Sequence, residues 1–188
     1  MKQFGPALKM LIFMTILTGG VYPFVITEIG NFFFAQKVEG SLVYNKAGQL
    51  IGSKLVAQNF KNSKYFWPRP SAVEYNPLPS GGSNLGPTSA VLKKKYEERK
   101  KRLMNADPGM VGEPPQDLLF ASGSGLDPDI SPSAALYQVP RVAKARGLDS
   151  NKVLALVKKF IKPRQWQVLG EPRVNVLELN LALDKIKR

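Results

Sequence analysis

The sequence predicts an α+β protein with one N-terminal transmembrane helix followed by a single extracytoplasmic α+β domain. Residues 10–27 contain no charged side chain, which is typical of a membrane span. After this run, a hairpin-like segment is followed by an irregular loop, several segments of helical periodicity and a final strand-like segment, and no internal repeat is evident. We therefore expect a cytoplasmic N-terminus at residues 1–9, an anchor helix at 10–34 and an extracytoplasmic α+β domain at 35–188.

The anchor helix is predicted from the length and composition of its apolar run. Only Glu28 interrupts this run before Phe34. About 20 apolar residues are enough to cross the ~30 Å hydrocarbon layer of a membrane. Gly19, Gly20 and Pro23 would break a soluble helix, but transmembrane helices tolerate such residues better. A soluble helix of this length would also carry a polar face, which this segment lacks.

A cleaved signal peptide is the alternative interpretation of this segment. Its apolar core would span about 7–15 residues and end at a small-x-small cleavage site. The run here is longer, and its only candidate site, Phe33-Phe34-Ala35, has a large Phe where a small residue is needed. The sequence therefore favours an uncleaved anchor.

The orientation of the anchor is predicted from the charges that flank it. Lys2 and Lys9 precede the span, whereas Lys37 follows it together with Glu28 and Glu39. Positive charge favours the cytoplasmic side, and long domains translocate largely regardless of their charge. We therefore expect the N-terminus inside and the bulk of the chain outside.

The first part of the domain is predicted to be a hairpin followed by a long irregular loop. In residues 38–60, apolar residues flank the turn cluster Asn45-Lys46-Ala47-Gly48, which is typical of a β-hairpin. Residues 65–89 contain five prolines among aromatic residues and glycines. Because proline lacks a backbone donor and fixes φ, neither a helix nor a central strand fits this segment. Long irregular segments of this kind tend to be functional loops or contact surfaces.

Helices are predicted from N-cap and breaker residues. Ser89 can cap a helix that runs to about Met104, after which a turn-rich segment ends it. Ser131 before Pro132 is a favourable N-cap followed by proline at the first helical position. Pro140 lies within the next helical pattern and should kink or split it.

The C-terminal part is predicted to contain one more helix and a strand. Gly147 is a suitable C-terminal stop for the preceding helix, and Ser150 can cap the next one. One face of that helix is apolar, at positions Val153, Leu154, Val157, Phe160 and Ile161. Residues 173–181 predict a strand, because Glu178 and Asn180 alternate with leucines.

Composition excludes several kinds of chemistry. The chain has no histidine and no cysteine, so it lacks the commonest general base and a zinc or copper site is disfavoured. Its net charge is +13, and residues 93–102 concentrate this charge. Nucleic acid is a formal partner for such a patch. In an anchored protein, a solvated helix face near anionic headgroups or a partner subunit fits better.

The stretch Ser-Gly-Ser-Gly at residues 122–125 suggests several kinds of site. A serine nucleophile needs a base within hydrogen-bond reach, and no histidine exists. The following Asp127-Pro128-Asp129 resembles the start of a calcium loop, but Pro132 and Gln138 stand where that loop needs Gly and Glu. Glycine-rich turns can also bind phosphate through backbone N–H groups. We favour a structural corner in which the glycines allow positive φ and close approach.

Four long motifs resemble the C subunit of the Kdp potassium-transporting P-type ATPase. They are GSKLVAQNFKNSKYFWPRPSA (52–72), YNPLPSGGSNLGPTS (75–89), ASGSGLDPDISPSAALYQVPRVAKARGL (121–148) and VNVLELNLALD (174–184). The single N-terminal helix is also similar, and the resemblance covers essentially the whole chain. Only Trp67-Pro68 departs from the more polar residues expected of relatives, which affects the detail of that loop.

The resemblance implies a non-catalytic subunit of a membrane complex that imports potassium with ATP. It implies three partners: a channel-like subunit that selects potassium, a pump subunit that hydrolyses ATP, and a small single-helix subunit. It also implies a role in assembly and an effect on the ATP affinity of the pump subunit. The family's nucleotide contact would map to Gln138, which requires a cytoplasmic domain and so conflicts with the orientation predicted here. An anchored extracytoplasmic hydrolase or an unrelated binding module is the alternative function.

The resemblance leads us to expect that the domain contacts the potassium-selecting subunit near its outer mouth. Aromatic residues and Arg dominate such contacts. The expected contact residues lie in the Pro-rich loop and its SGGSN turn: Tyr65, Phe66, Arg69, Tyr75, Asn76, Ser80, Gly81, Gly82, Ser83 and Asn84. Because a basic run would repel potassium within about a Debye length, ~8 Å, we also expect residues 93–102 to face away from the pore.

Overall fold

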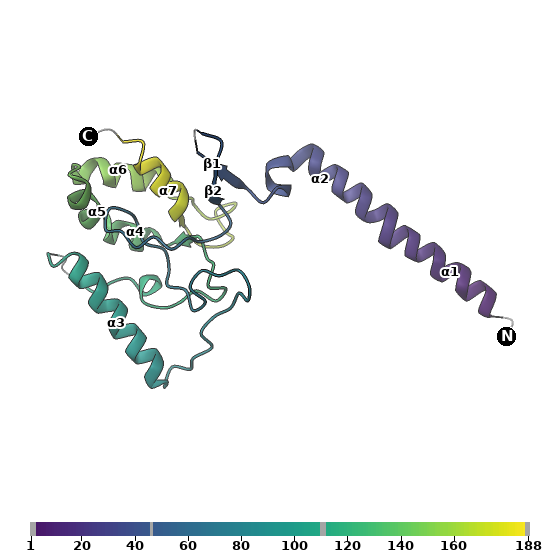
Figure 1. The fold of residues 1–188 in the computed structure, drawn as a ribbon, viewed down its shortest axis with the longest axis horizontal. Helices are drawn as coiled ribbons and strands as arrows, with labels where there is room; N and C mark the ends of the chain where they lie inside the picture. Colours follow the sequence, from purple (N-terminus) through teal and green to yellow (C-terminus); the bar gives the residue numbers. More distant parts are fainter. Residues whose placement is uncertain (1–2, 46, 110–111, 187–188) are drawn as a thin grey trace. The chain divides into compact units, whose positions relative to one another are not determined.

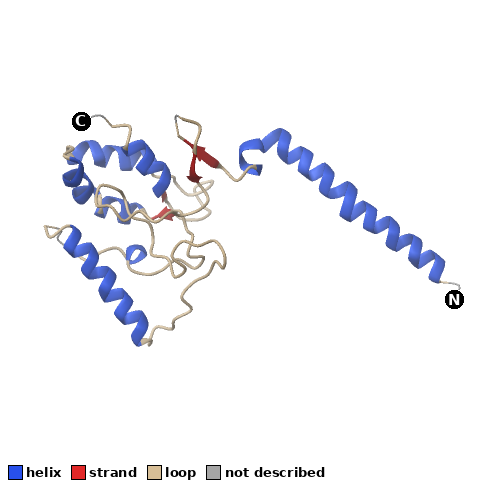
Figure 2. Ribbon diagram, in the orientation of Figure 1, coloured by secondary structure: helices blue, strands red, loops and turns tan. Residues whose placement is uncertain are grey.

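The structure confirms the α+β class and divides the chain into two compact units. The computed structural model describes residues 3–45, 47–109 and 112–186. The first unit is Met1–Ile51 and the second is Gly52–Arg188. The helices and strands (Figures 1 and 2) are α1 (Phe4–Ile16), the π-helix η1 (Leu17–Val21), α2 (Tyr22–Val38), β1 (Leu42–Tyr44), β2 (Leu50–Ser53), α3 (Ala90–Ala106), the 3-10 helix η2 (Gln116–Leu118), β3 (Asp129–Ile130), α4 (Pro132–Tyr137), α5 (Val139–Arg146), α6 (Ser150–Phe160), β4 (Val174–Asn175) and α7 (Val176–Leu183).

The first unit is dominated by a long apolar helix. Helical structure covers Phe4–Val38, which is 35 residues, with a kink at Phe34, where φ is −136° and ψ is 33°. Its most apolar part has a mean hydropathy of 1.8 with no buried residue. It includes the expected span 10–34 and extends beyond it at both ends. Pro23 lies at the start of α2, directly after the π-helical turn η1. Proline has no backbone N–H, so one hydrogen bond of the preceding turn is missing. The wider π-helical turn accommodates this loss, and the helix continues past Pro23.

The predicted hairpin is present as strands β1 and β2. The turn between them is organised by Asn45, whose side-chain oxygen accepts from the backbone N–H groups of Ala47 and Gln49, each at 2.9 Å. Its backbone N–H donates to the carbonyl of Gln49 at 2.9 Å. Lys46, which we expected in this turn, lies outside the described residues.

The second unit begins with an irregular segment that leads into helix α3. The structure contains neither helix nor strand from residue 54 to residue 89, as the prolines predicted. Ser89 then caps α3, and its hydroxyl accepts from the N–H of Leu92 at 3.4 Å. The cap and the end of this helix near Met104 were therefore predicted correctly, since α3 ends two residues later, at Ala106.

Helices α4 to α7 form the body of the second unit and are packed against one another. Ser131 caps α4, and Pro140 is the second residue of α5, where the helical pattern splits into α4 and α5 as predicted. Gly147 ends α5 in the left-handed region, with φ 63° and ψ 36°. The cap of α6 is Asp149, whose side chain accepts from the N–H of Asn151, so the predicted cap was one residue too late.

The strand predicted at residues 173–181 was mostly wrong. Only Val174–Asn175 is a strand, β4, which pairs antiparallel with β3 in the register Asp129↔Asn175 and Ile130↔Val174. The chain then turns into helix α7, because the Asn175 side chain accepts from the N–H of Glu178 at 3.0 Å and acts as an N-cap. The leucines of this segment are buried on most sides of the helix, so their alternation with polar residues was a poor guide.

The hydrophobic core lies among α4 to α7 and the segments that cross them. Its fully buried members include Val142, Val153 and Leu179, together with Phe66 from the Pro-rich loop. The Pro-rich loop therefore contributes Phe66 to the core, whereas other residues of the loop, such as Leu78, are exposed.

Candidate functional site

The Pro-rich loop, residues 65–89, is fixed to the helical body by two buried side-chain amides. Asn180 of α7 accepts from the N–H of Phe66 at 2.8 Å and donates to its carbonyl at 3.0 Å. Gln138, between α4 and α5, accepts from the N–H of Trp67 at 2.7 Å and donates to its carbonyl at 3.2 Å. The two amides thus pair with two successive residues of the loop in the way that a neighbouring strand would.

Gln138 has no hydrogen-bonding capacity left over. Its amide nitrogen also donates to the carbonyl of Ala134 at 3.2 Å, and its oxygen also accepts from Arg141 at 2.6 Å. Two donors and two lone pairs are the full capacity of a glutamine amide. Only 1% of the residue is exposed. The geometry therefore gives Gln138 a structural role, and a contact of this residue with a nucleotide stays a prediction.

Arg141 of α5 adds a buried positive charge under the same loop. Its guanidinium donates to the carbonyls of Ser63 and Tyr65 and lies 4.1 Å from the centre of the Trp67 ring. Burial lowers the pKa of Arg141 to about 10, so it remains charged at neutral pH. The side chain holds the start of the loop through carbonyl groups, and no ion pair of Arg141 occurs in the part of the chain that the structure describes.

The Ser-Gly stretch at residues 122–125 is the structural corner that we expected. Gly125 has φ 70°, and a Cβ there would lie 2.9 Å from the carbonyl oxygen of Gly81. The backbone N–H of Gly81 donates to Ser124 at 2.9 Å, and that of Ser122 donates to Pro70 at 3.0 Å. The SGGS turn and the SGSG corner therefore lie against each other, and glycine is required at their closest approach.

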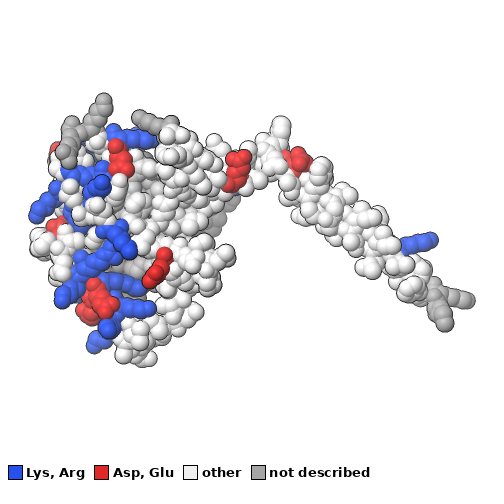
Figure 3. Space-filling model, viewed as in Figure 1, with Lys and Arg blue, Asp and Glu red and all other residues white. Residues whose placement is uncertain are grey.

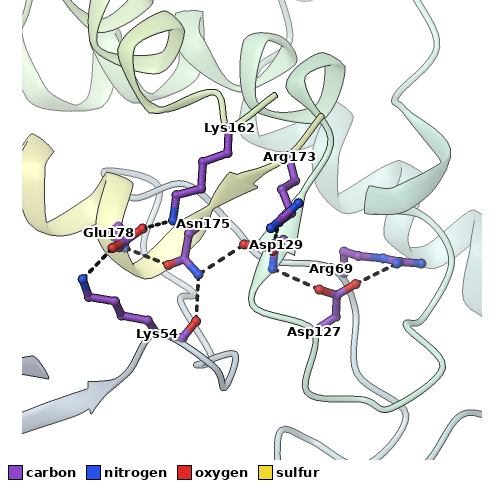
Figure 4. A network of polar contacts seen from close by, with 8 residues as sticks. All are labelled: Lys54, Arg69, Asp127, Asp129, Lys162, Arg173, Asn175 and Glu178. Atoms are coloured by element: carbon purple, nitrogen blue, oxygen red, sulfur yellow. Dashed lines mark hydrogen bonds and ion pairs between the residues drawn. The ribbon is translucent and has the colours of Figure 1, made fainter. Parts of the chain in front are cut away.

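A polar network joins the loop, the corner and the C-terminal segment (Figure 4). Arg69 pairs with Asp127 at 2.9 Å, and Asp127 also accepts from the N–H of Asp129 at 3.1 Å. Asp129 in turn pairs with Arg173 at 3.1 Å and accepts from Asn175 at 3.2 Å. Burial raises the pKa of Asp129, although Asn175 and Arg173 oppose this rise.

Glu178 forms the other end of this network. Its two carboxylate oxygens bind Lys54 at 2.9 Å and Lys162 at 2.6 Å, as Figure 4 shows. Burial alone would raise the pKa of Glu178, but the hydrogen bonds from Lys162 and Lys54 outweigh it and leave the pKa lowered. The carboxylate is therefore ionised at neutral pH and connects three distant segments of the second unit.

The expected contact residues divide into anchored and exposed groups. Phe66 is fully buried in the core, which does not favour a contact with a partner, and its role as a contact residue stays a prediction. Tyr65 donates to Asp184 at 3.2 Å, Arg69 pairs with Asp127, and Tyr75 donates to the carbonyl of Arg69 at 2.9 Å. These three side chains are half-buried and hold the loop in shape.

The tip of the loop is the part that solvent reaches. Gly81, Gly82 and Ser83 are half-buried at the corner, whereas Asn76, Ser80 and Asn84 are exposed. Leu78 lies among the exposed residues and is 81% exposed, which the sequence reasoning missed. A second exposed apolar group, Trp166, Val168 and Leu169, was also missed. An isolated leucine between two prolines gave no signal that it would be exposed.

The residues of the charged run 93–102 differ in how far they are exposed. Lys93, Lys94 and Lys101 are exposed, whereas Arg99 is half-buried and donates to the carbonyl of Leu119 at 2.7 Å. Figure 3 shows Lys and Arg gathered on the second unit, in contrast to the largely uncharged apolar helix. Which way the run faces relative to a pore remains a prediction.

The arrangement is suited to recognition. The described residues contain no group of three or more His, Cys, Asp and Glu that could hold a metal ion. The serines at 122–125 lie in a backbone corner, and Ser122 is buried. What the site offers is an irregular surface that is held rigidly by buried amides, an arginine and ion pairs.

Comparison with known proteins gives a consistent result along the whole chain. The family model "KdpC: K+-transporting ATPase, c chain" matches residues 4–185. A potassium-transporting ATPase KdpC subunit of Geotalea uraniireducens is 51% identical, with 100% of both chains covered. Those of Geobacter sulfurreducens and Methylococcus capsulatus are 50% and 49% identical, each with 99% of both chains covered.

Proposed function

This chain belongs to the KdpC family, the c chain of the K+-transporting ATPase, and on that premise we propose that it is a non-catalytic assembly subunit whose folded domain lies outside the cell membrane. It is an accessory subunit of a potassium import complex. The observation that carries the proposal is the similarity to KdpC subunits over the whole length, because it includes the apolar helix as well as the domain. ATP and potassium are then ligands of the complex, and this chain binds neither directly.

The placement of the domain is supported by the charges around the apolar helix. Lys2 and Lys9 lie on the N-terminal side, whereas Glu28 and Glu39 offset Lys37 on the other. The helix is exposed along its whole length and presents large apolar side chains, as expected of a single-pass anchor in a lipid bilayer. We infer residues 1–9 inside, 10–34 in the membrane and 35–188 outside.

The proposed partners are the potassium-selecting subunit, the ATP-hydrolysing pump subunit and the small single-helix subunit. The tip of the Pro-rich loop is the proposed contact with the potassium-selecting subunit, and Leu78 is added to the exposed residues Asn76, Ser80 and Asn84. A rigid loop favours binding, because little conformational entropy is lost when the partner docks. The buried amides supply that rigidity.

Any effect of this subunit on ATP affinity is then indirect. With the domain outside, no side chain of residues 35–188 reaches a cytoplasmic nucleotide. A subunit can still change ligand affinity on the other side of the membrane if it binds two states of the complex with different strength. The alternative of an anchored hydrolase has no support, because the sequence lacks His and Cys and the comparisons point to a transport subunit.

The function is tested by replacing Leu78 in cells that depend on this transport system. Leu78→Asp places a charge at the centre of the proposed contact. We expect co-purification with the other subunits to fall at least about tenfold, which corresponds to a loss of ~1.4 kcal/mol of binding free energy. We also expect the cells to grow poorly at limiting potassium. Val91→Asp, an exposed residue of α3, is the matched control and should have no effect. Normal growth and yield with Leu78→Asp would refute the contact, and normal growth without the chain would refute the function.

A further inference from the structure

A pocket beside the Pro-rich loop has a composition that points to a ligand. It has a volume of about 320 Å³ and lies among the loop, the preceding segment, α3 and Leu118. Its cationic lining residues are Lys61, Arg99 and Arg102, and Glu74 is the single acid of its lining. The rest of the wall is mostly apolar or aromatic, including Phe60, Trp67, Tyr75 and Leu103.

The three cations of the pocket have no carboxylate partner within residues 3–45, 47–109 and 112–186. Arg99 donates to one neutral acceptor, the carbonyl of Leu119, which leaves most of its five N–H groups available. Other arginines of this unit bind carboxylates, such as Arg69, which pairs with Asp127 at 2.9 Å, and Arg146, which pairs with Asp184 at 2.6 Å. Unpaired arginines concentrated in one concave site indicate an anionic occupant.

The burial of Arg99 and Tyr75 strengthens the preference of the pocket for an anion. Burial lowers the pKa of Arg99 and raises the pKa of Tyr75, so both groups lie where water solvates charge poorly. An anion in such a site interacts more strongly with arginine than it would at an open surface. Arginine also binds carboxylates through two parallel hydrogen bonds.

The aromatic residues restrict the shape of the occupant. The Trp67 ring has Arg102 at 4.3 Å and Arg141 at 4.1 Å from its centre. Its faces are occupied by guanidinium groups, so a nucleotide base could not stack on them. The volume is at the lower end of the roughly 300–1,000 Å³ of small-molecule sites, and the apolar wall suits the stem of an amino-acid side chain.

We propose that this pocket receives an acidic side chain from a segment of a partner subunit, whose carboxylate pairs with Arg99 and Arg102. The proposal rests on the proposed function, because the partner is another subunit of the same complex. The contact neutralises the half-buried Arg99 and the exposed Arg102, which both line the pocket, whereas the lysines of α3 do not line it and stay solvated. It adds a charged contact to the apolar one at Leu78.

The test uses the assembled complex, purified from cells that express this chain with its own partner subunits. Arg102→Gln should lower co-purification about tenfold at ~0.1 M salt and weaken its dependence on salt, since a screened ion pair is lost. Lys101→Gln removes the same charge from a neighbour that is exposed like Arg102 but does not line the pocket, and it should leave co-purification and its salt dependence unchanged. The thermal midpoint of each free chain is measured to detect loss of folding.

A second variant tests the contact without removing the charge. Arg102→Lys introduces an amine that a water-soluble carbodiimide can join to a carboxylate through an amide bond. We expect a crosslink from position 102 to an Asp or Glu of a partner, at least about tenfold stronger than that from Lys101, and it should weaken as salt rises. Peptide mass spectrometry identifies the partner residue.

Three outcomes would contradict the proposal. Normal co-purification of Arg102→Gln with no crosslink from Arg102→Lys would show that the pocket is not a docking site, while the subunit role stands. A thermal midpoint raised by inorganic phosphate in the wild type but not in Arg102→Gln, with assembly unaffected, would identify a small-anion site instead. Failure of the wild-type chain to co-purify at all would refute the proposed function itself.

Discussion

Replacing Phe66 with alanine is expected to lower the free energy of unfolding by about 3–5 kcal/mol, the usual cost of removing a buried aromatic ring. Phe66 is fully buried, and Asn180 holds its backbone on both sides, so the loop cannot easily collapse into the vacated space. Urea unfolding of the full chain in detergent micelles measures this change through the fluorescence of Trp67, with the exposed Trp166 replaced by Phe so that a single tryptophan reports.

The matched control for Phe66→Ala is Leu78→Ala in the same loop. Leu78 is 81% exposed, so its replacement should change stability by less than about 0.5 kcal/mol. If Phe66→Ala were as stable as the control and failed only in binding to partner subunits, Phe66 would be a contact residue and its burial would not describe the free chain.

The second large effect is expected at Gln138. Gln138→Ala leaves the N–H and carbonyl of Trp67 and one N–H of Arg141 without their partner in a buried site. Each buried group without a hydrogen bond costs about 1–3 kcal/mol, and water can enter part of the space, so we expect a loss of about 2–4 kcal/mol. Gln116→Ala, an exposed glutamine, should change stability by less than about 0.5 kcal/mol.

The same variant distinguishes a structural role for Gln138 from a nucleotide contact. Asn180→Ala removes the equivalent amide from Phe66 and provides a variant of similar instability. In assembled complexes, the apparent ATP affinity should change equally for the two variants. A fall in ATP affinity with Gln138→Ala alone would show a direct contact and would contradict the structural role.

Local signals in the sequence predicted most of the helices. Ser89 and Ser131 act as N-caps, and Gly147 ends its helix, because each depends on bonds to residues a few positions away. The cap at Asn175 was missed although Glu178 follows it three residues later, a pattern that favours a helix start. The alternation of the leucines that follow suggested a strand.

The candidate site could be predicted only in outline. The prolines of the loop excluded regular structure, and its aromatic residues indicated a contact surface. Nothing local could show that Phe66 points inward, since its partner Asn180 is 114 residues away, or that Gln138 binds Trp67 from 71 residues away. The unpaired arginines of the pocket lie within the run 93–102, for which the sequence predicted a solvated helix face near anionic headgroups or a partner.

The position of the domain outside the membrane is tested most directly by cysteine accessibility. The chain has no native cysteine, so Lys93→Cys, at an exposed position of α3, and Gln3→Cys, before the apolar helix, each provide a single reporter. Cells with a permeable outer barrier are treated with a membrane-impermeant maleimide, before and after lysis. We expect position 93 to be labelled in intact cells and position 3 only after lysis. Labelling of position 3 in intact cells, with position 93 protected until lysis, would place the domain in the cytoplasm and contradict the proposed orientation.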